Sequence, residues 1–267
     1  MPAVHVRPPA VAGMFYPGDA RELARDVAAM LAAAGPPVFV PKALIVPHAG
    51  YVYSGPIAAN AYALVAPLRE TIRRVVLFGP THRVPVRGLA VSMVDAFATP
   101  LGDIALDKEA IAAALRLPQV QPGDVAHALE HSLEVQLPFL QAVLSDFELV
   151  PFAVGDATGA EVAEVMEALW GGAETLILVS SDLSHYHAYG AAQRLDRQTA
   201  DDILHLRPLA DHDQACGATP INGLIAAAQR KGLHAQLLDL RNSGDTAGDK
   251  SRVVGYAAFA FTAASDG

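Results

Sequence analysis

Apolar and polar positions follow two patterns that alternate along the chain. Short runs such as ALIV, VVLF and LILV are apolar at every position, which is typical of strands covered by helices on both faces. Strand-like runs span 43–46, 74–78, 89–93, 148–154, 175–180, 235–240 and 253–261. Stretches rich in Ala, Leu and Glu predict helices over 20–34, 56–67, 108–115, 130–144, 160–170, 188–205 and 220–231. The alternation predicts an α/β fold with a central, mostly parallel or mixed sheet flanked by helices.

Two of the predicted helices carry start signals. Ser54-Gly55-Pro56 and Thr219-Pro220 each place a capping residue before a proline suited to the first helical turn. Since no repeat, low-complexity tract or linker interrupts the pattern, we expect residues 1–267 to form a single domain.

Composition and charge exclude several classes of protein. With 52% apolar and 18% charged residues, the chain is too hydrophobic for intrinsic disorder. Its 19 Lys and Arg against 28 Asp and Glu give a net charge of −9, which argues against nucleic acid and anionic membranes as partners. The uncharged stretch 43–68 contains prolines, glycines and polar residues that a lipid-facing helix rarely tolerates.

The cysteine count and the first residues predict the compartment. Residues 1–18 lack the apolar segment of a signal peptide, so we expect no export. The single cysteine, Cys216, excludes an internal disulfide and fits a reducing compartment. The sequence therefore predicts a cytoplasmic protein.

Polar residues that could bind a metal or take part in catalysis follow the ends of predicted buried strands. His48 comes after ALIVP, His82 after VVLFGPT, and Asp182 and His185 after LILVSS. Open α/β sheets bind ligands outside the carboxyl ends of their strands, so these side chains would converge on one cleft if the strands are parallel neighbours. Each residue alone also fits a structural role, and Asp182 with His185 also fits the capped start of a helix.

Cys216 and the segment EHSLEVQLPF supply further candidates. Cys216 precedes a predicted helix, whose dipole would lower the pKa of its thiol and favour metal binding, although a lone cysteine is often a small buried apolar residue. Glu130 and Glu134 would share a helix face beside His131, either as metal ligands or as residues that hold a ligand histidine. The chain has no G-x-S-x-G, P-loop or dinucleotide-binding motif.

These segments, taken in order, resemble the Memo family. The resemblance rests on VAGMFYPGD, PHAGYVYSG, GPTH, EHSLEVQLPFL, SSDLSHY, the lone CG and NSGD…VVGYAAFAF, and it runs from Val11 to Phe261. Bacterial and archaeal members belong to the AmmeMemoRadiSam system, which implies an AMMECR-domain protein and a radical SAM enzyme as partners. The family is similar in fold to class III extradiol dioxygenases.

The resemblance also implies a metal site. The family's metal-binding histidines fall on His48 and His82, and its metal-associated cysteine falls on Cys216. The acid and histidine of the cleft fall on Asp182 and His185, which we expect to handle protons rather than bind the metal. The related dioxygenases hold ferrous iron with two histidines and a glutamate. Because a cysteine replaces that glutamate here, ring cleavage is doubtful and copper(I) becomes an alternative to iron.

Three hypotheses remain open at this stage. The first is a redox-active iron or copper protein that acts on an unidentified substrate. The second is a non-catalytic protein that binds a peptide, a small molecule or a metal in the same cleft. The third, for which the support is weaker, is hydrolysis assisted by zinc with His185 as the base.

Overall fold

The computed structural model describes residues 4–263, and the two ends of the predicted domain, 1–3 and 264–267, lie outside the described residues. The strands are β1 (Val6–Arg7), β2 (Ala43–Val46), β3 (Arg74–Pro80), β4 (Leu89–Val91), β5 (Ala96–Thr99), β6 (Gly102–Ala105), β7 (Val120–Pro122), β8 (Glu148–Val154), β9 (Thr175–Ser180), β10 (His185–His187), β11 (Leu233–Asn242) and β12 (Val253–Ala263). The α-helices are α1 (Ala20–Ala33), α2 (Tyr51–Val65), α3 (Lys108–Ala114), α4 (Asp124–Ala128), α5 (Leu137–Val143), α6 (Gly159–Ala168), α7 (Tyr189–Leu204), α8 (Ala218–Lys231) and α9 (Ser243–Thr246). Two 3₁₀ turns, η1 (Ala66–Leu68) and η2 (Glu134–Gln136), complete the described elements.

A mixed sheet forms the centre of the molecule. Its strands follow the order β10-β12-β2-β9-β3-β8-β4-β7, and β11 pairs with the free side of β12. The four strands β2, β9, β3 and β8 are mutually parallel, whereas β12 and β4 run antiparallel to their neighbours β2 and β8. A second, small sheet has the order β1-β5-β6. This topology confirms the mixed sheet that the sequence predicts.

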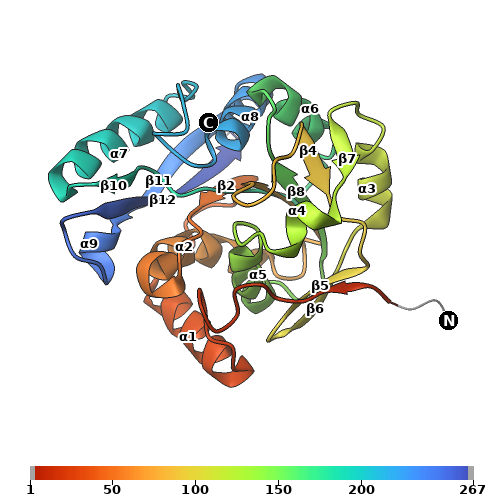
Figure 1. The fold of residues 1–267 in the computed structure, drawn as a ribbon, viewed down its shortest axis with the longest axis horizontal. Helices are drawn as coiled ribbons and strands as arrows, with labels where there is room; N and C mark the ends of the chain where they lie inside the picture. Colours follow the sequence, from red (N-terminus) through yellow and green to blue (C-terminus); the bar gives the residue numbers. More distant parts are fainter. Residues whose placement is uncertain (1–3, 264–267) are drawn as a thin grey trace.

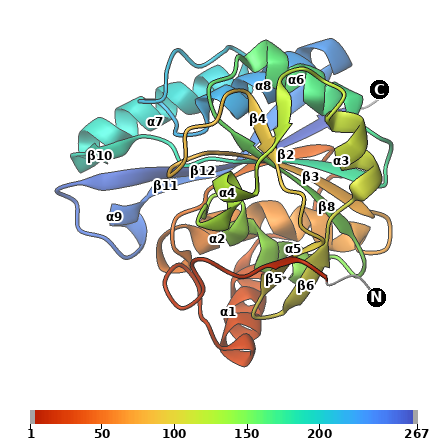
Figure 2. The ribbon, with the colours of Figure 1, turned by 45° about the vertical axis from the view of Figure 1, so that its right-hand side comes forward.

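Helices cover both faces of the central sheet, as the unbroken apolar strands require. In Figure 2 the sheet is seen close to edge-on, with α6, α7 and α8 on one side and α1, α2 and α5 on the other. Every residue of β2 and of β9 is buried. Because a strand buried on both faces gains nothing from alternating polar positions, its sequence is apolar throughout. The structure confirms the α/β class.

Two predicted helices begin later or earlier than the sequence signals indicate. The helix expected over 56–67 begins at Tyr51, so Pro56 lies inside α2 rather than at its first turn. The start signal at Ser54 fails because most of α2 is buried and is stabilised by packing rather than by a cap. The helix expected over 130–144 is confined to η2 and α5, and Glu130 lies in the preceding loop.

The loop at Glu130 has a local electrostatic cause. The Glu130 carboxylate accepts hydrogen bonds from the backbone N–H groups of His131 and Ser132. These side-chain contacts satisfy backbone donors in a non-helical conformation, so they compete with helix formation. As a result Glu130 and Glu134 do not share a helix face as the sequence suggested.

The segment after β9 also differs from its prediction. Asp182 and His185 were expected at the start of a helix, but His185 opens the short strand β10 and α7 begins only at Tyr189. The helix α8 packs closely on this region, since a Cβ at Gly217 would lie 2.7 Å from the Cβ of Ser181. Among residues 4–263, none of the helices has both the length and the apolar character needed to cross a bilayer.

Candidate metal centre

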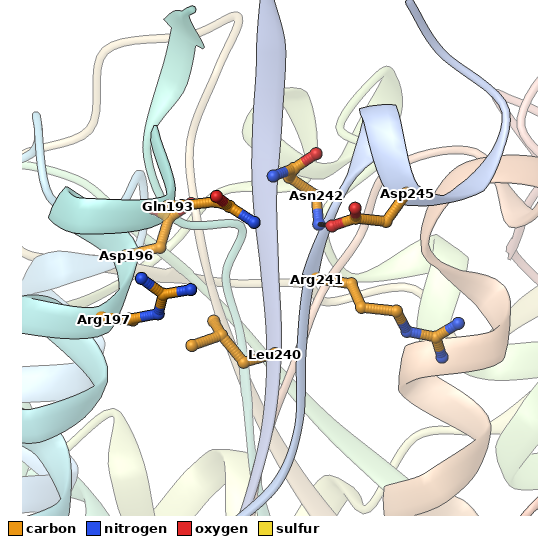
Figure 3. Close-up of a pocket in the computed structure, with 7 residues that line it drawn as sticks. All are labelled: Gln193, Asp196, Arg197, Leu240, Arg241, Asn242 and Asp245. Carbon is orange, nitrogen blue, oxygen red and sulfur yellow. Dashed lines mark hydrogen bonds between the residues drawn. The ribbon is translucent and has the colours of Figure 1, made fainter. Parts of the chain in front are cut away.

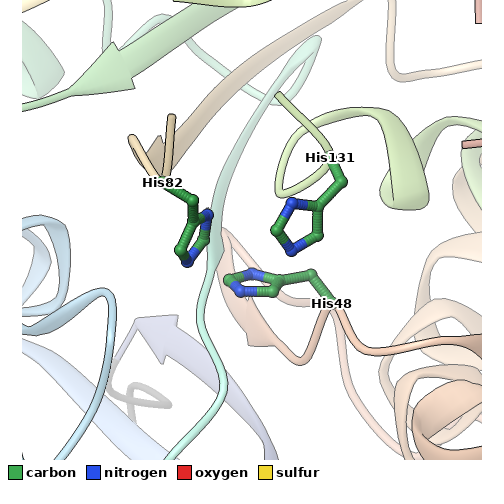
Figure 4. Close-up of side chains that lie close together, drawn as sticks. All are labelled: His48, His82 and His131. Atoms are coloured by element: carbon green, nitrogen blue, oxygen red, sulfur yellow. The ribbon is translucent and has the colours of Figure 1, made fainter. Parts of the chain in front are cut away.

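Three histidines from distant parts of the chain converge beyond the carboxyl ends of the parallel strands (Figure 4). His48 follows β2 and His82 follows β3, while His131 comes from the loop before η2. One ring nitrogen of each residue lies within 4.8 Å of the others. The ring centroids are 5.3 Å apart for His48 and His82, 5.4 Å for His48 and His131, and 4.6 Å for His82 and His131. These separations allow one first-row metal ion to contact all three rings.

The hydrogen bonds of His48 fix its tautomer. Its Nδ1 lies 2.9 Å from the Oγ of Ser180, and that hydroxyl donates its single proton to the carbonyl of Ser132 at 2.6 Å. Ser180 must therefore accept from the Nδ1–H of His48, which leaves the Nε2 unprotonated, facing the Cys216 sulfur and available to a metal. Burial lowers the pKa of His48 well below its usual value, and the nearby histidines His131 and His82 add to the shift. The ring is thus neutral and able to bind a metal.

Glu130 orients the second histidine. Its carboxylate accepts from the His82 backbone N–H at 2.6 Å and lies 2.9 Å from the His82 Nδ1. Burial alone would raise the pKa of Glu130, but the hydrogen bond and charge of His82 and the backbone N–H groups of Ser132 and His82 lower it to about 2. A carboxylate on Nδ1 is the arrangement by which proteins orient a metal-binding imidazole and increase its basicity.

His131 completes the cluster and answers a question that the sequence left open. Its Nδ1 lies 3.3 Å from the same Glu130 oxygen, and its ring packs on Phe15 with the centroids 4.8 Å apart. Burial lowers the pKa of His131 to about 4, so this ring is also neutral at pH 7. His131 therefore lies among the candidate ligands, while Glu130 holds two of the rings.

Cys216 and Asp182 lie on the opposite side of His48 from Ser180. The Cys216 Sγ is 3.3 Å from the His48 Nε2 and accepts the Asp182 backbone N–H at 3.3 Å. The Asp182 Oδ1 accepts the His48 backbone N–H at 2.7 Å, so this carboxylate supports His48 rather than capping a helix. Burial raises the pKa of Asp182 to about 7, although the N–H groups of His48 and Ala49 oppose the shift.

The expectation of a low-pKa thiol at Cys216 is wrong for the metal-free protein. Burial, reinforced by the charge of Asp182, raises the pKa of Cys216 to about 12. Helix α8 begins two residues later, at Ala218, so its terminus does not offset the loss of solvent. The thiol is protonated in the absence of metal, and binding a cation through sulfur would have to displace that proton.

His185 lies near the cluster without joining it. The residue is half-buried on β10, and burial lowers the pKa of its imidazole, to which the charge of His82 also contributes. The structure therefore brings four of the sequence candidates into contact around His48, namely His48, His82, Asp182 and Cys216, whereas His185 lies three residues beyond Asp182. The sequence missed the roles of Ser180 and His131, whose positions depend on the loop at 130–133.

A second polar site, at the NSGD turn, is structural. Asn242 caps α9 by accepting the Gly244 N–H, and Asp245 returns a contact to the Asn242 N–H at 3.0 Å. Figure 3 shows this turn beside Gln193, Asp196 and Arg197 of α7. The pocket between them has a volume of about 40 Å³, which is enough for a water molecule and too small for an organic ligand.

Comparisons with known proteins find relatives that match nearly the whole chain. A family model described as Memo-like protein matches residues 7–260. A MEMO1 family protein of Ignicoccus hospitalis is 39% identical over 96% of this chain and 98% of its own length. A MEMO1 family protein of Aquifex aeolicus is 34% identical over 97% of this chain and its full length. A MEMO1 family protein of Methanopyrus kandleri is 36% identical over 96% of this chain and 98% of its own length.

A solved structure shares the fold at much lower sequence similarity. The crystal structure of the uncharacterized protein JW3007 from Escherichia coli K12 matches with a TM-score of 0.50 and 12% identity. The match covers 83% of this chain and 99% of that protein. It supports the α/β architecture alone.

Proposed function

The chain belongs to the Memo family, and from this premise we propose that it holds a redox-active iron ion in its histidine cluster and acts on a small molecule or peptide. The observation that carries the proposal is the set of contacts at the Nδ1 atoms. Ser180 holds His48, and Glu130 holds both His82 and His131, which leaves the Nε2 atoms for a cation. Such contacts are typical of metal-binding imidazoles.

The donor set fits a transition-metal ion. Imidazole suits iron, copper and zinc, while a thiolate from Cys216 adds a soft ligand that also suits copper(I). We favour iron because of the family's similarity to iron-dependent dioxygenases, and copper is the alternative occupant. When bound, the ion would supply one-electron redox chemistry. His82 is exposed, so a molecule from solvent can reach this side of the cluster.

Two residues of the chain can handle protons beside the cluster. The imidazole of His185 is neutral at pH 7, because burial lowers its pKa, and can accept a proton from a bound molecule. The carboxyl of Asp182, with its pKa raised by burial to about 7, can exchange a proton near neutral pH. Both roles remain part of the proposal.

Metal analysis of anaerobically purified protein tests the proposal. We expect about one iron ion per chain in the wild type and a loss of at least ~10-fold in His82→Ala and Cys216→Ser, because each variant removes a ligand. Glu130→Gln should weaken metal affinity by about 10–100-fold, since it removes the charge that orients His82 and His131. His187→Ala, on an exposed residue of β10, is the matched control.

Different outcomes contradict different parts of the proposal. Full metal occupancy in His82→Ala and Cys216→Ser would show that the ligand assignment is wrong. Zinc in place of iron or copper would leave the metal site intact and overturn the redox role. Electron paramagnetic resonance before and after oxidation distinguishes these cases.

A further inference from the structure

Tyr186 has a backbone conformation that bulky residues rarely adopt. Its φ is +63°, in the left-handed region. The other non-glycine residue with positive φ among residues 4–263 is Leu206 (φ +53°), which lies just past the end of α7, where such a conformation commonly terminates a helix. Tyr186 has no such explanation, because it lies in the middle of β10.

The conformation follows from a bulge against β12. Before the bulge, the Leu183 N–H donates to Gly255 O and the Gly255 N–H donates to Ser184 O, each at 2.8 Å. Across the bulge, His185 pairs with Val254 and His187 pairs with Val253, so two steps on β10 oppose one step on β12. Tyr186 is the additional residue, and bulges of this kind redirect side chains.

Contacts on both sides prevent the strand from relaxing out of the bulge. The Asp196 Oδ1 of α7 accepts the Ser184 N–H at 3.1 Å, and the Tyr189 N–H donates to Lys250 O at 3.2 Å. A Cβ at Gly255 would lie 2.2 Å from an Asp196 oxygen, which shows how closely β12 and α7 approach each other. The excess length between these fixed points must be accommodated at residues 185–187.

The bulge separates three neighbouring side chains. His185 is half-buried and lies three residues after Asp182, whose carboxylate accepts the His48 backbone N–H at 2.7 Å. Tyr186 is 63% exposed, with its ring 5.0 Å from the Arg252 guanidinium and 5.7 Å from the His185 ring. His187 is exposed to solvent.

We propose that Tyr186 is a positioning residue, whose left-handed backbone forms the bulge that turns the His185 imidazole toward His82 and the metal centre. The backbone conformation of Tyr186 positions His185, whereas the tyrosine ring packs on Arg252 and does not contribute to that positioning. The inference rests on the proposed function in one respect, since the molecule with which His185 would exchange protons is the one bound at the histidine cluster.

Substitutions at residue 186 can separate backbone conformation from the ring. Asparagine and glycine accept the left-handed region, whereas a β-branched valine does not. In metal-free protein, we expect diethylpyrocarbonate to modify His185 about 5-fold faster in Tyr186→Val, and within about 2-fold of wild type in Tyr186→Asn and Tyr186→Gly. Peptide mass spectrometry reads each histidine separately, and exposed His187 is the internal reference.

Two further variants act as controls. Leu206→Val perturbs the other left-handed residue and should leave the His185 rate unchanged. Arg252→Ala removes the partner of the Tyr186 ring and should also leave it unchanged. If Tyr186→Val does not fold, as judged by circular dichroism, Tyr186→Ala takes its place in the experiment. Alanine also disfavours the left-handed backbone conformation, but at a smaller energetic cost than valine.

A spectroscopic measurement on metal-loaded protein tests the direction of the imidazole. With Co²⁺ as the probe, the His185 ring protons of wild type, Tyr186→Asn and Tyr186→Gly should show the same paramagnetic shift, and Tyr186→Val should lose it while retaining Co²⁺. A wild-type rate and shift in Tyr186→Val would overturn the inference. If wild type binds no Co²⁺, the proposed metal function fails, and the modification rates still decide the role of Tyr186.

Discussion

At the scale of single residues, the site depends on which atom of each side chain is already engaged. Ser180 holds the Nδ1 of His48 and Glu130 holds that of His82, and these contacts leave Nε2 for a cation. The strand-end pattern located His48 and His82 from sequence because short loops tie them to buried strands. The pattern could not assign His131, because its position depends on backbone N–H groups folding around the Glu130 carboxylate.

Burial was the residue property that the sequence predicted least well. Cys216 lies near a helix start, but it is enclosed by Ser181, Asp182 and His48, so desolvation raises its pKa. The enclosing residues come from the segments that follow β2 and β9, far away in sequence. Desolvation of this kind depends on tertiary packing and is invisible in the local pattern.

His127 gives a pH-dependent prediction away from the metal centre. It is 1% exposed, its Nε2 lies 3.0 Å from Ala90 O, and burial lowers its pKa to about 4. As the pH falls from 6.5 to 4, the unfolded chain binds a proton that the folded protein excludes. The contribution of His127 to the free energy of unfolding is therefore complete above pH 6.5 and is lost as the pH falls, by about 3 kcal/mol.

His127→Gln tests this prediction, because glutamine can donate to Ala90 O and does not titrate. Urea unfolding of metal-free protein at pH 7 and pH 4 should show a fall in stability that is about 3 kcal/mol smaller in the variant. His234→Gln, on an exposed residue, should behave as wild type. An equal fall in wild type and His127→Gln would show that the residue is protonated in the folded state.

At the scale of elements, the sequence predicted the type of most segments and missed several boundaries. The bounds of β2, β8 and β9 agree with the predicted runs, because largely apolar sequence coincides there with burial of every residue except Glu148. The start of α2 predicted from Pro56 is wrong, because tertiary packing of the buried helix outweighs the local signal of the proline and the helix begins at Tyr51. The segment 130–144 has a helical pattern, but the contacts of Glu130 divide it.

A buried network fixes the N-terminal segment against η2. The Glu134 carboxylate is fully buried, pairs with Arg7 at 2.8 Å, and accepts from the Tyr16 hydroxyl at 2.7 Å. It also accepts the backbone N–H groups of Ala10 and Val11. Arg7 in turn donates to Glu130 O at 2.8 Å, so this network supports the loop that carries His131.

Removing Glu134 should be strongly destabilising. Glu134→Ala leaves the buried Arg7 guanidinium without its counter-charge and three other donors without an acceptor, so we expect a loss of about 3–5 kcal/mol in urea unfolding. Glu167→Ala breaks the more exposed pair with Arg230 and should cost at most ~1 kcal/mol. The double variant Arg7→Met, Glu134→Leu should remain less stable than wild type, because Ala10, Val11 and Tyr16 still lack an acceptor. Full recovery would show that the ion pair alone matters.

At the scale of the whole molecule, strand order determines where the site forms. The strands β2, β9 and β3 are adjacent and parallel, so the segments that follow them meet at one edge of the sheet. The sequence indicated that these strands were buried but not which of them were neighbours. Figure 1 shows the resulting arrangement, in which early and late parts of the chain meet around the same sheet.

This arrangement couples metal binding to global stability. The candidate ligands His48 and Cys216 are 168 residues apart in sequence, and His82 and His131 lie between them, so unfolding destroys the site. A ligand that binds only the folded state stabilises it by about 2.7 kcal/mol at a free concentration 100 times its dissociation constant. For a protein of this size, anaerobic Fe²⁺ at that concentration should raise Tm by about 5–10 °C, as measured by circular dichroism. The increase should grow with the logarithm of the Fe²⁺ concentration, reverse on adding a chelator, and be at most about half as large in His82→Ala, whose affinity for the metal is at least ~10-fold lower. A wild-type Tm that does not respond to Fe²⁺, Cu⁺ or Zn²⁺ would mean that the cluster serves packing rather than metal binding.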